Sequence, residues 1–371
     1  MDYMRKLKNV LMVSSACISF YIGAGFATMQ EIMQYEVSYG SQFPLVILIT
    51  LLIYLYTNFS FAINAGYLKL AKGTNIYDVY CGIFGKKYGE IFSRFFKCFS
   101  VFFCYMSFVV MCGGADATFM QHWGFPKYIG ALILAIASTM TVILGLKGIV
   151  KSLGKCGSLI IGFILIIAAY SAVTGIANYN TNIIDINNGK YLNLLKQIGG
   201  GNPFAAGASY GGFVILWFAA FLSEISMKND LKIIHMGVLG SAIFIFGTAF
   251  LCCLALINYI NIVAVADIPA LILAEQLSEN LAFAFAVIIY LGIYTSAVPL
   301  LWTPVRYLAN EGTAKYKLMT CIAGAVGFGI ACFIPYKGLI NILYGINGYL
   351  GFLLVFIMLW HDVPQLVKRH L

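Results

Sequence analysis

The sequence predicts an all-α integral membrane protein with ten transmembrane helices. Of its 371 residues, 61% are hydrophobic and only 10% are charged, whereas a soluble domain has about 25% charged residues. Crossing a bilayer takes about 20 apolar residues, and ten apolar runs meet this length. One transmembrane domain is therefore expected over residues 1–371, with spans at 9–36, 42–69, 94–120, 127–146, 150–175, 207–227, 232–258, 281–304, 317–335 and 339–360.

The basic residues predict how these spans are oriented. With ten spans, both ends of the chain lie on one side of the membrane. Of the 23 Lys and Arg residues, 19 fall at the two ends or in the loops after spans two, four, six and eight. The remaining four, in the alternate loops, are Lys127, Lys190, Lys196 and Lys337. Because cytoplasmic loops are enriched in Lys and Arg, both termini are expected in the cytoplasm. The protein itself is expected in the plasma membrane.

Charge and cysteine content argue against a nucleic-acid-binding protein, a zinc protein and a disulfide-rich protein. The net charge of +9 follows from the topology, so no nucleic-acid partner is expected. The ten cysteines lie mostly within apolar runs and form no pattern typical of a zinc site or a disulfide framework. The expected partners are therefore the lipid bilayer and a small-molecule substrate, and the sequence makes no prediction of oligomeric state.

Two loops on the outer side are more than simple connections. Residues 176–206 are polar and rich in Gly and Asn, with a short surface helix expected at 190–198. Residues 259–280 contain "IPALILAEQLSE", an apolar stretch too short to span the bilayer. This stretch is expected to form a helix over the outer mouth of the protein.

The spacing of the spans indicates two related halves. Pro44 near the start of span two and Ile233 near the start of span seven are 189 residues apart, and so are residues 150 and 339 at the starts of spans five and ten. Five spans per half would place the second half upside-down relative to the first. The sequence therefore predicts a 5+5 inverted repeat, over residues 9–175 and 207–361, joined by the outer loop 176–206.

The first span contains an unusual stretch, "FYIGAGFATMQEI" at residues 20–32. A glycine inside a helix costs about 1 kcal/mol relative to alanine, and a carboxylate at the centre of a bilayer costs at least about 2.5–3.5 kcal/mol. One interpretation is a break in the helix at Gly23-Ala24-Gly25, with the freed backbone groups facing a substrate. The alternative is a glycine face used for close helix packing.

The stretch "YIGAGFATMQEI" resembles the first-helix motif of the YkvI-like family of bacterial membrane proteins. That family is more distantly similar to the LeuT-fold transporters of the amino acid–polyamine–organocation superfamily. The resemblance implies that helices 1 and 6 are discontinuous at mid-membrane and hold the substrate. The break in the sixth span would fall at Phe218–Phe221, although this sequence has no glycine there.

The resemblance also implies a place for a coupling ion. Gly292, Thr295 and Ser296 match, in order and spacing, the eighth-helix part of a sodium site in sodium-coupled relatives. The carbonyls of Ser19 and Ile22 would complete it. Alternatively, Thr295 and Ser296 bond back to their own helix. Na⁺ would be the only cofactor.

A proton is the alternative coupling ion. Lys155, in "GKC" at the start of the fifth span, resembles the lysine that takes the sodium position in some proton-coupled relatives. It could equally extend to the cytoplasmic interface. Glu31, Asp116 and Glu224 are expected at the membrane interfaces, but Glu31 would become a proton carrier if it faced a cavity.

Glycines and aromatic residues near the presumed mid-depth complete the predicted substrate site. Tyr105 is the first choice for a polar contact, because a buried tyrosine hydroxyl needs a partner. The resemblance places the third and eighth helices beside the site. The predicted substrate-binding residues are Gly23, Ala24, Gly25, Phe26, Tyr105, Phe108, Trp217, Phe218, Phe221 and Tyr294.

Taken together, these features predict a secondary active transporter, a symporter of a small polar organic solute such as an amino acid or an amine, working by alternating access. No catalytic motif is found, so the protein is not expected to be an enzyme. The alternative is a transporter-like receptor subunit that binds a ligand without moving it.

Overall fold

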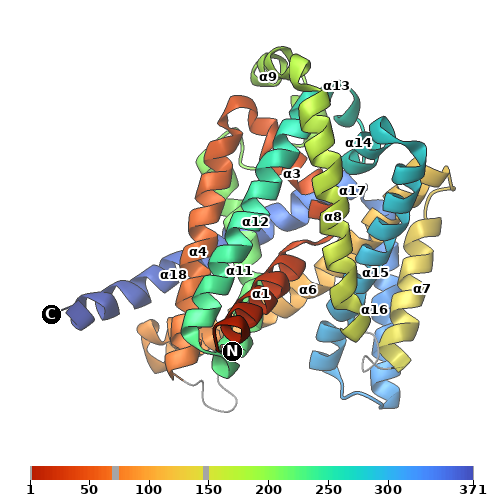
Figure 1. Ribbon diagram of the computed structural model, residues 1–371. Helices are drawn as coiled ribbons and strands as arrows, with labels where there is room; N and C mark the ends of the chain where they lie inside the picture. Colours follow the sequence, from red (N-terminus) through yellow and green to blue (C-terminus); the bar gives the residue numbers. More distant parts are fainter. Residues whose placement is uncertain (1, 69–74, 145–149, 371) are drawn as a thin grey trace.

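The protein is a bundle of long helices (Figure 1), seen in a computed structural model that describes residues 2–68, 75–144 and 150–370. The described segments are helices and connections, with no strand among them, which confirms the predicted all-α class. The long helices are α1 (Asp2–Tyr21), α4 (Phe43–Leu68), α6 (Gly85–Trp123), α7 (Ile129–Leu144), α8 (Val150–Thr174), α11 (Pro203–Lys228), α12 (Leu231–Asn258), α15 (Glu279–Leu308), α16 (Ala314–Phe333) and α18 (Gly345–His370).

Shorter elements connect or extend these helices. Residues 190–198 hold only one helical turn, α10, whereas the longer α9 before it was not predicted. The apolar stretch within residues 259–280 is the helix α14, as predicted. The short elements are α2 (Ala24–Ala27), α3 (Gln30–Tyr35), η1 (Val37–Gln42), α5 (Ile76–Cys81), η2 (Gly82–Phe84), η4 (Ile176–Asn178), α9 (Tyr179–Asn187), α10 (Leu192–Leu195), α13 (Ile260–Val263), α14 (Pro269–Leu277), α17 (Tyr336–Leu339) and the π-helical η5 (Ile340–Tyr344).

Many of the helices are suited to a membrane. By length and composition, six described helices can cross a bilayer, or up to eight if two bent pairs each count as one span. One bent pair joins Ile160–Thr174 to Ile176–Asn187, and the other joins Pro203–Leu216 to Phe218–Met227. The helix Ile129–Leu144 is apolar but shorter. The protein is thus a multi-pass membrane protein, and ten spans remain a prediction.

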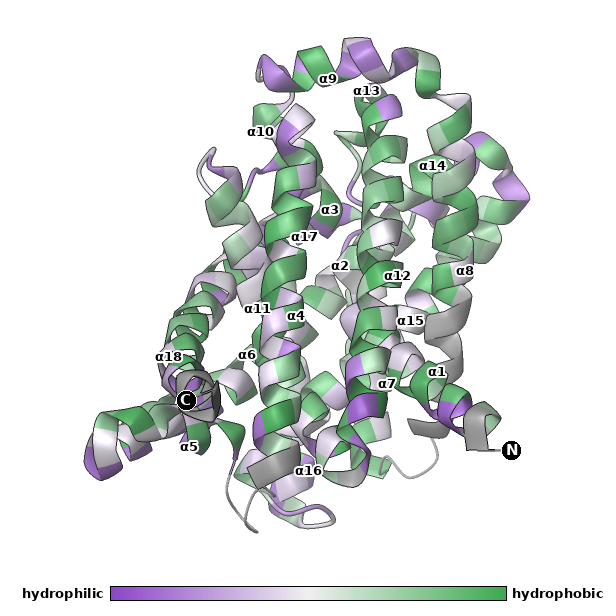
Figure 2. Ribbon diagram, turned by 60° about the vertical axis from the view of Figure 1, so that its left-hand side comes forward, coloured by the Kyte–Doolittle hydropathy of each residue, from purple (hydrophilic) through white to green (hydrophobic). Residues whose placement is uncertain are grey.

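Hydrophilic residues concentrate at the ends of the bundle (Figure 2). The short helix α9 lies across one end, and both termini lie toward the other. Asn182 on α9 donates to the carbonyls of Ile257 and Asn258, at 2.9 Å each, and so attaches α9 to the last turn of α12. These bonds satisfy carbonyls that the end of a helix leaves without partners.

Glycines allow α11 to approach α4 closely. Gly207 and Gly211 lie four residues apart on one face of α11, and a Cβ at either position would come within 2.7–2.8 Å of the Cβ atoms of Ile49 and Ile53 on α4. Small residues at this spacing let two helix backbones pack tightly inside a membrane.

A second close crossing joins α11 to α18. A Cβ at Gly351 of α18 would lie 1.8 Å from the carbonyl oxygen of Gly212, and a Cβ at Gly212 would lie 2.0 Å from the carbonyl oxygen of Gly348. Here backbone packs on backbone, with no side chain between the two helices. The sixth span is therefore held by glycine contacts on two sides.

A partly buried polar cluster fixes the C-terminal part of α18. The Asp362 carboxylate accepts hydrogen bonds from Tyr56 and Asn64 of α4, at 3.1 Å each, and from Ser60. The ring Nδ1 of His361 lies 2.8 Å from Oδ1 of Asp362, which is the oxygen that also accepts the hydrogen bond from Asn64. Several partners compensate the desolvation of one buried carboxylate, so α4 and α18 stay in register at this end.

Candidate functional site

The first span is interrupted in the middle of the molecule. Its first helix, α1, ends at Tyr21, and α2 begins at Ala24 after two non-helical residues. Between α2 and α3 the buried residue Met29 adopts a left-handed backbone conformation, with φ of 62°. Such a conformation costs a non-glycine residue about 1–3 kcal/mol and tends to occur at functional sites. The predicted interruption near Gly23 is therefore present, and the chain turns a second time at Met29.

Polar side chains line the buried segment that follows the break. Thr28, Gln30, Glu31, Gln34 and Glu36 are each at most 2% exposed. Isolated polar groups are costly inside a protein unless they are hydrogen-bonded. Five buried polar residues within nine positions thus mark this segment, which we call the polar strip, as the candidate functional site.

Glu31 is the central residue of the polar strip. Its Oε2 accepts a hydrogen bond of 3.2 Å from the Tyr210 hydroxyl of α11, whereas its Oε1 is buried with no partner. The carboxyl group occupies the space beside Gly25, since a Cβ at that glycine would lie 2.0 Å from Oε1. Glu31 was expected at a membrane interface rather than buried, whereas the structure buries its side chain within the protein. Glycine 25 leaves room for the carboxyl group.

Glu36 repeats this arrangement against a different helix. Its side chain is fully buried, its Oε2 accepts from the Cys253 thiol of α12 at 3.3 Å, and its Oε1 has no partner. A thiol is a weak donor. Neither Glu31 nor Glu36 forms an ion pair with a described basic residue. The two carboxyl groups thus each have a single neutral donor, contributed by the second half of the chain.

Other members of the polar strip connect it to the elements that cover it. The Thr28 hydroxyl lies 3.0 Å from the Gly25 carbonyl and 3.1 Å from the Tyr336 hydroxyl. Gln34 donates to the carbonyl of Lys337 at 3.0 Å, and the amide of Ala270 on α14 donates to the Thr28 carbonyl at 3.1 Å. The polar strip is therefore covered by α14 and α17.

A half-buried acid and a base accompany this cover. Lys337 donates from Nζ to the Ala264 carbonyl at 2.9 Å. In the loop before α14, burial raises the pKa of Asp267, and the charge of Lys337 offsets part of that rise. The charge on Lys337 thus favours the ionised form of Asp267 and helps hold this loop against α17.

Three of the predicted aromatic residues gather beside the break. Phe26 and Phe218 are fully buried, and both rings contact Tyr21, at 6.0 and 6.4 Å between centroids. Phe221 stacks on Phe20 at 4.3 Å. Gly23 and Gly25 are buried at the same place, whereas the side chains of Ala24 and Trp217 lie outside the described residues. A bend of 51° separates Pro203–Leu216 from Phe218–Met227, close to the break expected in the sixth span, but α11 stays helical through it.

The other three predicted aromatic residues contact different helices. Tyr105 donates to the Ala323 carbonyl of α16 at 2.9 Å, and Phe108 faces Gly327 on the same helix. The Tyr294 hydroxyl lies 2.7 Å from that of Thr141 on α7. These partners satisfy the two tyrosine hydroxyls within the helix bundle. The structure thus gives Tyr105 a backbone partner where the sequence predicted a substrate contact.

Of the five predicted sodium ligands, Thr295 and Gly292 form a described hydrogen bond with each other. The Thr295 hydroxyl donates to the Gly292 carbonyl at 2.8 Å, which is the alternative arrangement, in which the hydroxyl bonds back to its own helix. No described hydrogen bond joins Ser19 or Ile22 to Ser296. Lys155 belongs to α8, but its side chain lies outside the described residues.

The two remaining acidic candidates differ from Glu31. Asp116 is half-buried on α6, with its Oδ1 lacking a described partner, and Glu224 is exposed on α11. In the described part of the chain, no three His, Cys, Asp or Glu side chains gather as metal ligands. Among the candidate acids, Glu31 is therefore the residue that the fold brings to the break.

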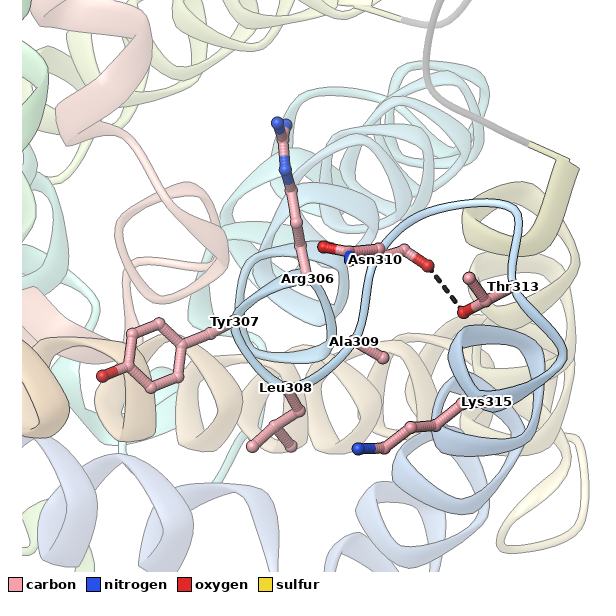
Figure 3. A pocket seen from close by; sticks show the side chains of 7 residues that line it. All are labelled: Arg306, Tyr307, Leu308, Ala309, Asn310, Thr313 and Lys315. Atoms are coloured by element: carbon pink, nitrogen blue, oxygen red, sulfur yellow. Dashed lines mark hydrogen bonds between the residues drawn. The ribbon is translucent and has the colours of Figure 1, made fainter.

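Two pockets lie at opposite ends of the molecule. One, of about 300 Å³, lies between α15 and α16 (Figure 3), where Thr313 donates to the Asn310 carbonyl at 2.7 Å beside Arg306 and Lys315. The other, of about 460 Å³, is lined by Lys196, Gln197 and Asn341 among other residues. Neither pocket is lined by a residue of the polar strip, so both are peripheral to the candidate site.

The sequence analysis missed one member of the polar strip, Glu36, and three partners of the strip, Tyr210, Cys253 and Tyr336. One signal was available for Glu36, because five polar residues fall between positions 28 and 36 of an otherwise apolar span. No local signal was available for the other three. They come from the second half of the chain, and only the fold places them against the first span.

Comparisons with known proteins give a distant likeness. No family model and no curated protein match the sequence. Among solved structures, the manganese transporter of Eremococcus coleocola in complex with an aromatic bis-isothiourea substituted compound is 13% identical, with a TM-score of 0.43 over 96% of this chain and 72% of that chain. Two mutants of that transporter are 13% identical, with TM-scores of 0.41 over 98% of this chain and 73% of theirs.

Proposed function

We propose that this protein is an ion-coupled secondary transporter that moves a small polar organic solute, an amino acid or an amine, by alternating access. The observation that carries the proposal is the interrupted first span, which ends at Tyr21 and resumes as the polar strip. Backbone and side-chain polar groups at membrane depth need partners from protein, water or a ligand. Interrupted helices of this kind form the substrate sites of inverted-repeat transporters.

The helix packing supports the predicted 5+5 arrangement. In that arrangement the first and sixth spans correspond, as do the second and seventh. The first span packs on the seventh (α1 on α12), and the sixth packs on the second (α11 on α4), so exchanging the halves converts one pair into the other. The third span with the ninth, and the eighth with the fourth, form a second exchanged pair (α6 with α16, and α15 with α7).

The chemistry of the break favours a solute with hydrogen-bond donors. Gln30 has a buried amide oxygen without a partner, and the Tyr344 hydroxyl is also buried and unpartnered. An ammonium or amide group would donate to such acceptors. The aromatic rings of Phe26 and Phe218 would pack against the apolar part of the solute. An amino acid or a small amine fits this combination.

Counterflow in proteoliposomes tests the proposed function directly. Vesicles containing the purified protein are preloaded with one unlabelled amino acid or amine and diluted into a trace of the same labelled compound. We expect transient accumulation of label with at least one member of the panel, because a transporter exchanges its substrate without a driving force. The same vesicles without protein are the control.

The alternative function, a ligand-sensing receptor subunit, predicts a different result in that experiment. A receptor would bind a member of the panel, and the unfolding temperature of the protein would rise because the compound binds preferentially to the native state. It would show no exchange of label. Binding without counterflow for the same compound would therefore replace transport with sensing.

The predicted sodium site leads to a separate expectation. Because the Thr295 hydroxyl already donates to Gly292, we expect Thr295→Ala to leave counterflow unchanged, with or without sodium. The measurement compares label uptake in sodium and choline buffers for both proteins. A sodium-dependent uptake that Thr295→Ala removes would instead support an ion held by Ser19, Ile22, Gly292, Thr295 and Ser296.

A further inference from the structure

We propose that Glu31 and Glu36 are two proton-carrying carboxyl groups, and that both must be protonated for the polar strip to close against α11 and α12. The inference rests on the proposed transport function and names its coupling ion as the proton. It goes further than that function by identifying a second carboxyl group and the residues that hold each one.

The hydrogen-bond pattern is the first support. Each carboxyl group accepts one bond from a neutral donor of the second half of the chain: Tyr210 for Glu31 and Cys253 for Glu36. Each has one oxygen that is buried without a partner. An ionised carboxylate has acceptor capacity on both oxygens, whereas a protonated one carries a proton of its own. A single neutral donor cannot compensate a buried negative charge, whose desolvation costs several kcal/mol.

The described side chains around Glu31 and Glu36 supply no positive charge. Several groups interact electrostatically with Glu31 or Glu36 from α1, α3, α11, α12, α17 and η5, and all of them are tyrosines or cysteines. None of them is positively charged. They are Tyr21, Tyr35, Tyr210, Tyr336, Tyr344, Cys252 and Cys253. The charge of Glu36 also acts on Glu31, and two like charges disfavour each other's ionised form.

The space beside Gly25 suits a proton better than a larger cation. Gly25 has no side chain, and the Glu31 carboxyl group fills that position, with Oε1 only 2.0 Å from where a Cβ would be. Neither described pocket is lined by Glu31 or Glu36. A sodium ion or an ammonium group needs a volume of its own, whereas a proton on the carboxyl oxygen needs almost none.

The resulting cycle is simple in its chemistry. When the polar strip is open to outer water, each carboxylate takes one proton from that water, and the neutral carboxyl groups are then buried against Tyr210 and Cys253. When the site opens to the cytoplasm, each carboxyl group returns its proton to water and becomes charged. Two protons would move inward per cycle, and no other reactant is required.

Infrared spectroscopy of the purified protein tests protonation without any need for a substrate. At neutral pH we expect absorption from protonated carboxyl groups. Glu31→Gln and Glu36→Gln should each remove their own band, because glutamine has the shape of a protonated glutamate but no carboxyl group. Glu224→Gln, at an exposed position, is the matched control and should remove none. If the wild-type protein shows no protonated band that these two variants remove, the proposal is overturned.

Variants of the two donors test the geometry. Tyr210→Phe removes the hydroxyl and should shift the Glu31 band alone. Cys253→Ser retains a donor and should keep the Glu36 band near its position, whereas Cys253→Ala should shift it. Bands that are insensitive to both donors would contradict the assignment of each carboxyl group to its partner.

Transport measurements then separate this proposal from the proposed function. For a solute that shows counterflow, Glu31→Gln and Glu36→Gln should lose the accumulation driven by a pH gradient, because neither glutamine can take up or release a proton. Accumulation that persists in both variants would overturn proton coupling while leaving transport intact. If no solute shows counterflow in the wild-type protein, the proposed transport function is contradicted. The infrared measurement still tests the protonation of Glu31 and Glu36, because it needs no substrate.

Discussion

The Gly351→Leu variant is expected to lose its folded structure. A Cβ at this position would lie 1.8 Å from the Gly212 carbonyl oxygen and 2.4 Å from the carbon of the same carbonyl. The obstacle is backbone, so no change of side-chain rotamer on α11 can relieve it. The helices must separate, which loses their contacts. Overpacking alone costs about 1–3 kcal/mol, and sometimes more, out of a total stability of about 5–15 kcal/mol.

Size-exclusion chromatography and thermal unfolding in detergent measure this effect. We expect Gly351→Leu to aggregate or to unfold well below the wild-type temperature, and Gly351→Ala to lie between the two. Gly247→Leu is the matched control, because an added Cβ at Gly247 of α12 would meet open space. A Gly351→Leu protein that elutes and unfolds like the control would show that α11 and α18 do not cross as described.

The Gly25→Leu variant is expected to fold but to lose transport. Here the added Cβ would meet the end of the Glu31 side chain, with Oε1 at 2.0 Å and Cδ at 2.4 Å. That side chain can turn away, so the helices need not separate. Turning away breaks the bond from Tyr210, however, and leaves the polar strip unable to close in the described arrangement. The loss should therefore appear in function and only weakly in stability.

Counterflow and thermal unfolding, measured on the same preparation, check this expectation. Gly25→Leu should unfold near the wild-type temperature and show the label uptake of vesicles without protein. The comparison variant is Glu31→Ala, which also loses the hydrogen bond from Tyr210 but has no clash at residue 25. If Gly25→Leu unfolds far below Glu31→Ala, the glycine serves mainly in packing, which was the alternative interpretation of the sequence.

Most of the fold was predictable because the membrane imposes strong rules on composition. Long apolar runs must be helices, since no other single segment satisfies its own backbone in lipid. The interruption near Gly23 was predictable because two glycines flank one alanine at mid-span. The short helix α9 was missed because its sequence, residues 179–187, is polar and has no strong periodicity.

The burial of Glu31 could not be predicted from the sequence, for a geometric reason. Counting 1.5 Å per residue along a straight helix from Lys8 places Glu31 near the outer surface. The chain instead turns at Gly23 and again at Met29, so it advances less than the count assumes. Position along a straight helix therefore does not predict the burial of residues after a break, and the partner of Glu31, Tyr210, comes from a span that is distant in sequence.

The π-helical turn η5 has a consequence for how the tenth span could change its contacts. A π turn holds one residue more than an α turn, and each residue in an α-helix advances the azimuth by about 100°. The glycines that meet α11, Gly348 and Gly351, follow directly after this turn. Converting η5 to regular α-helix would rotate them away from Gly212. The extra residue of the turn at 340–344 thus sets the rotation of all of α18 about its own axis. A change in this one turn would therefore make or break the contact between α18 and α11.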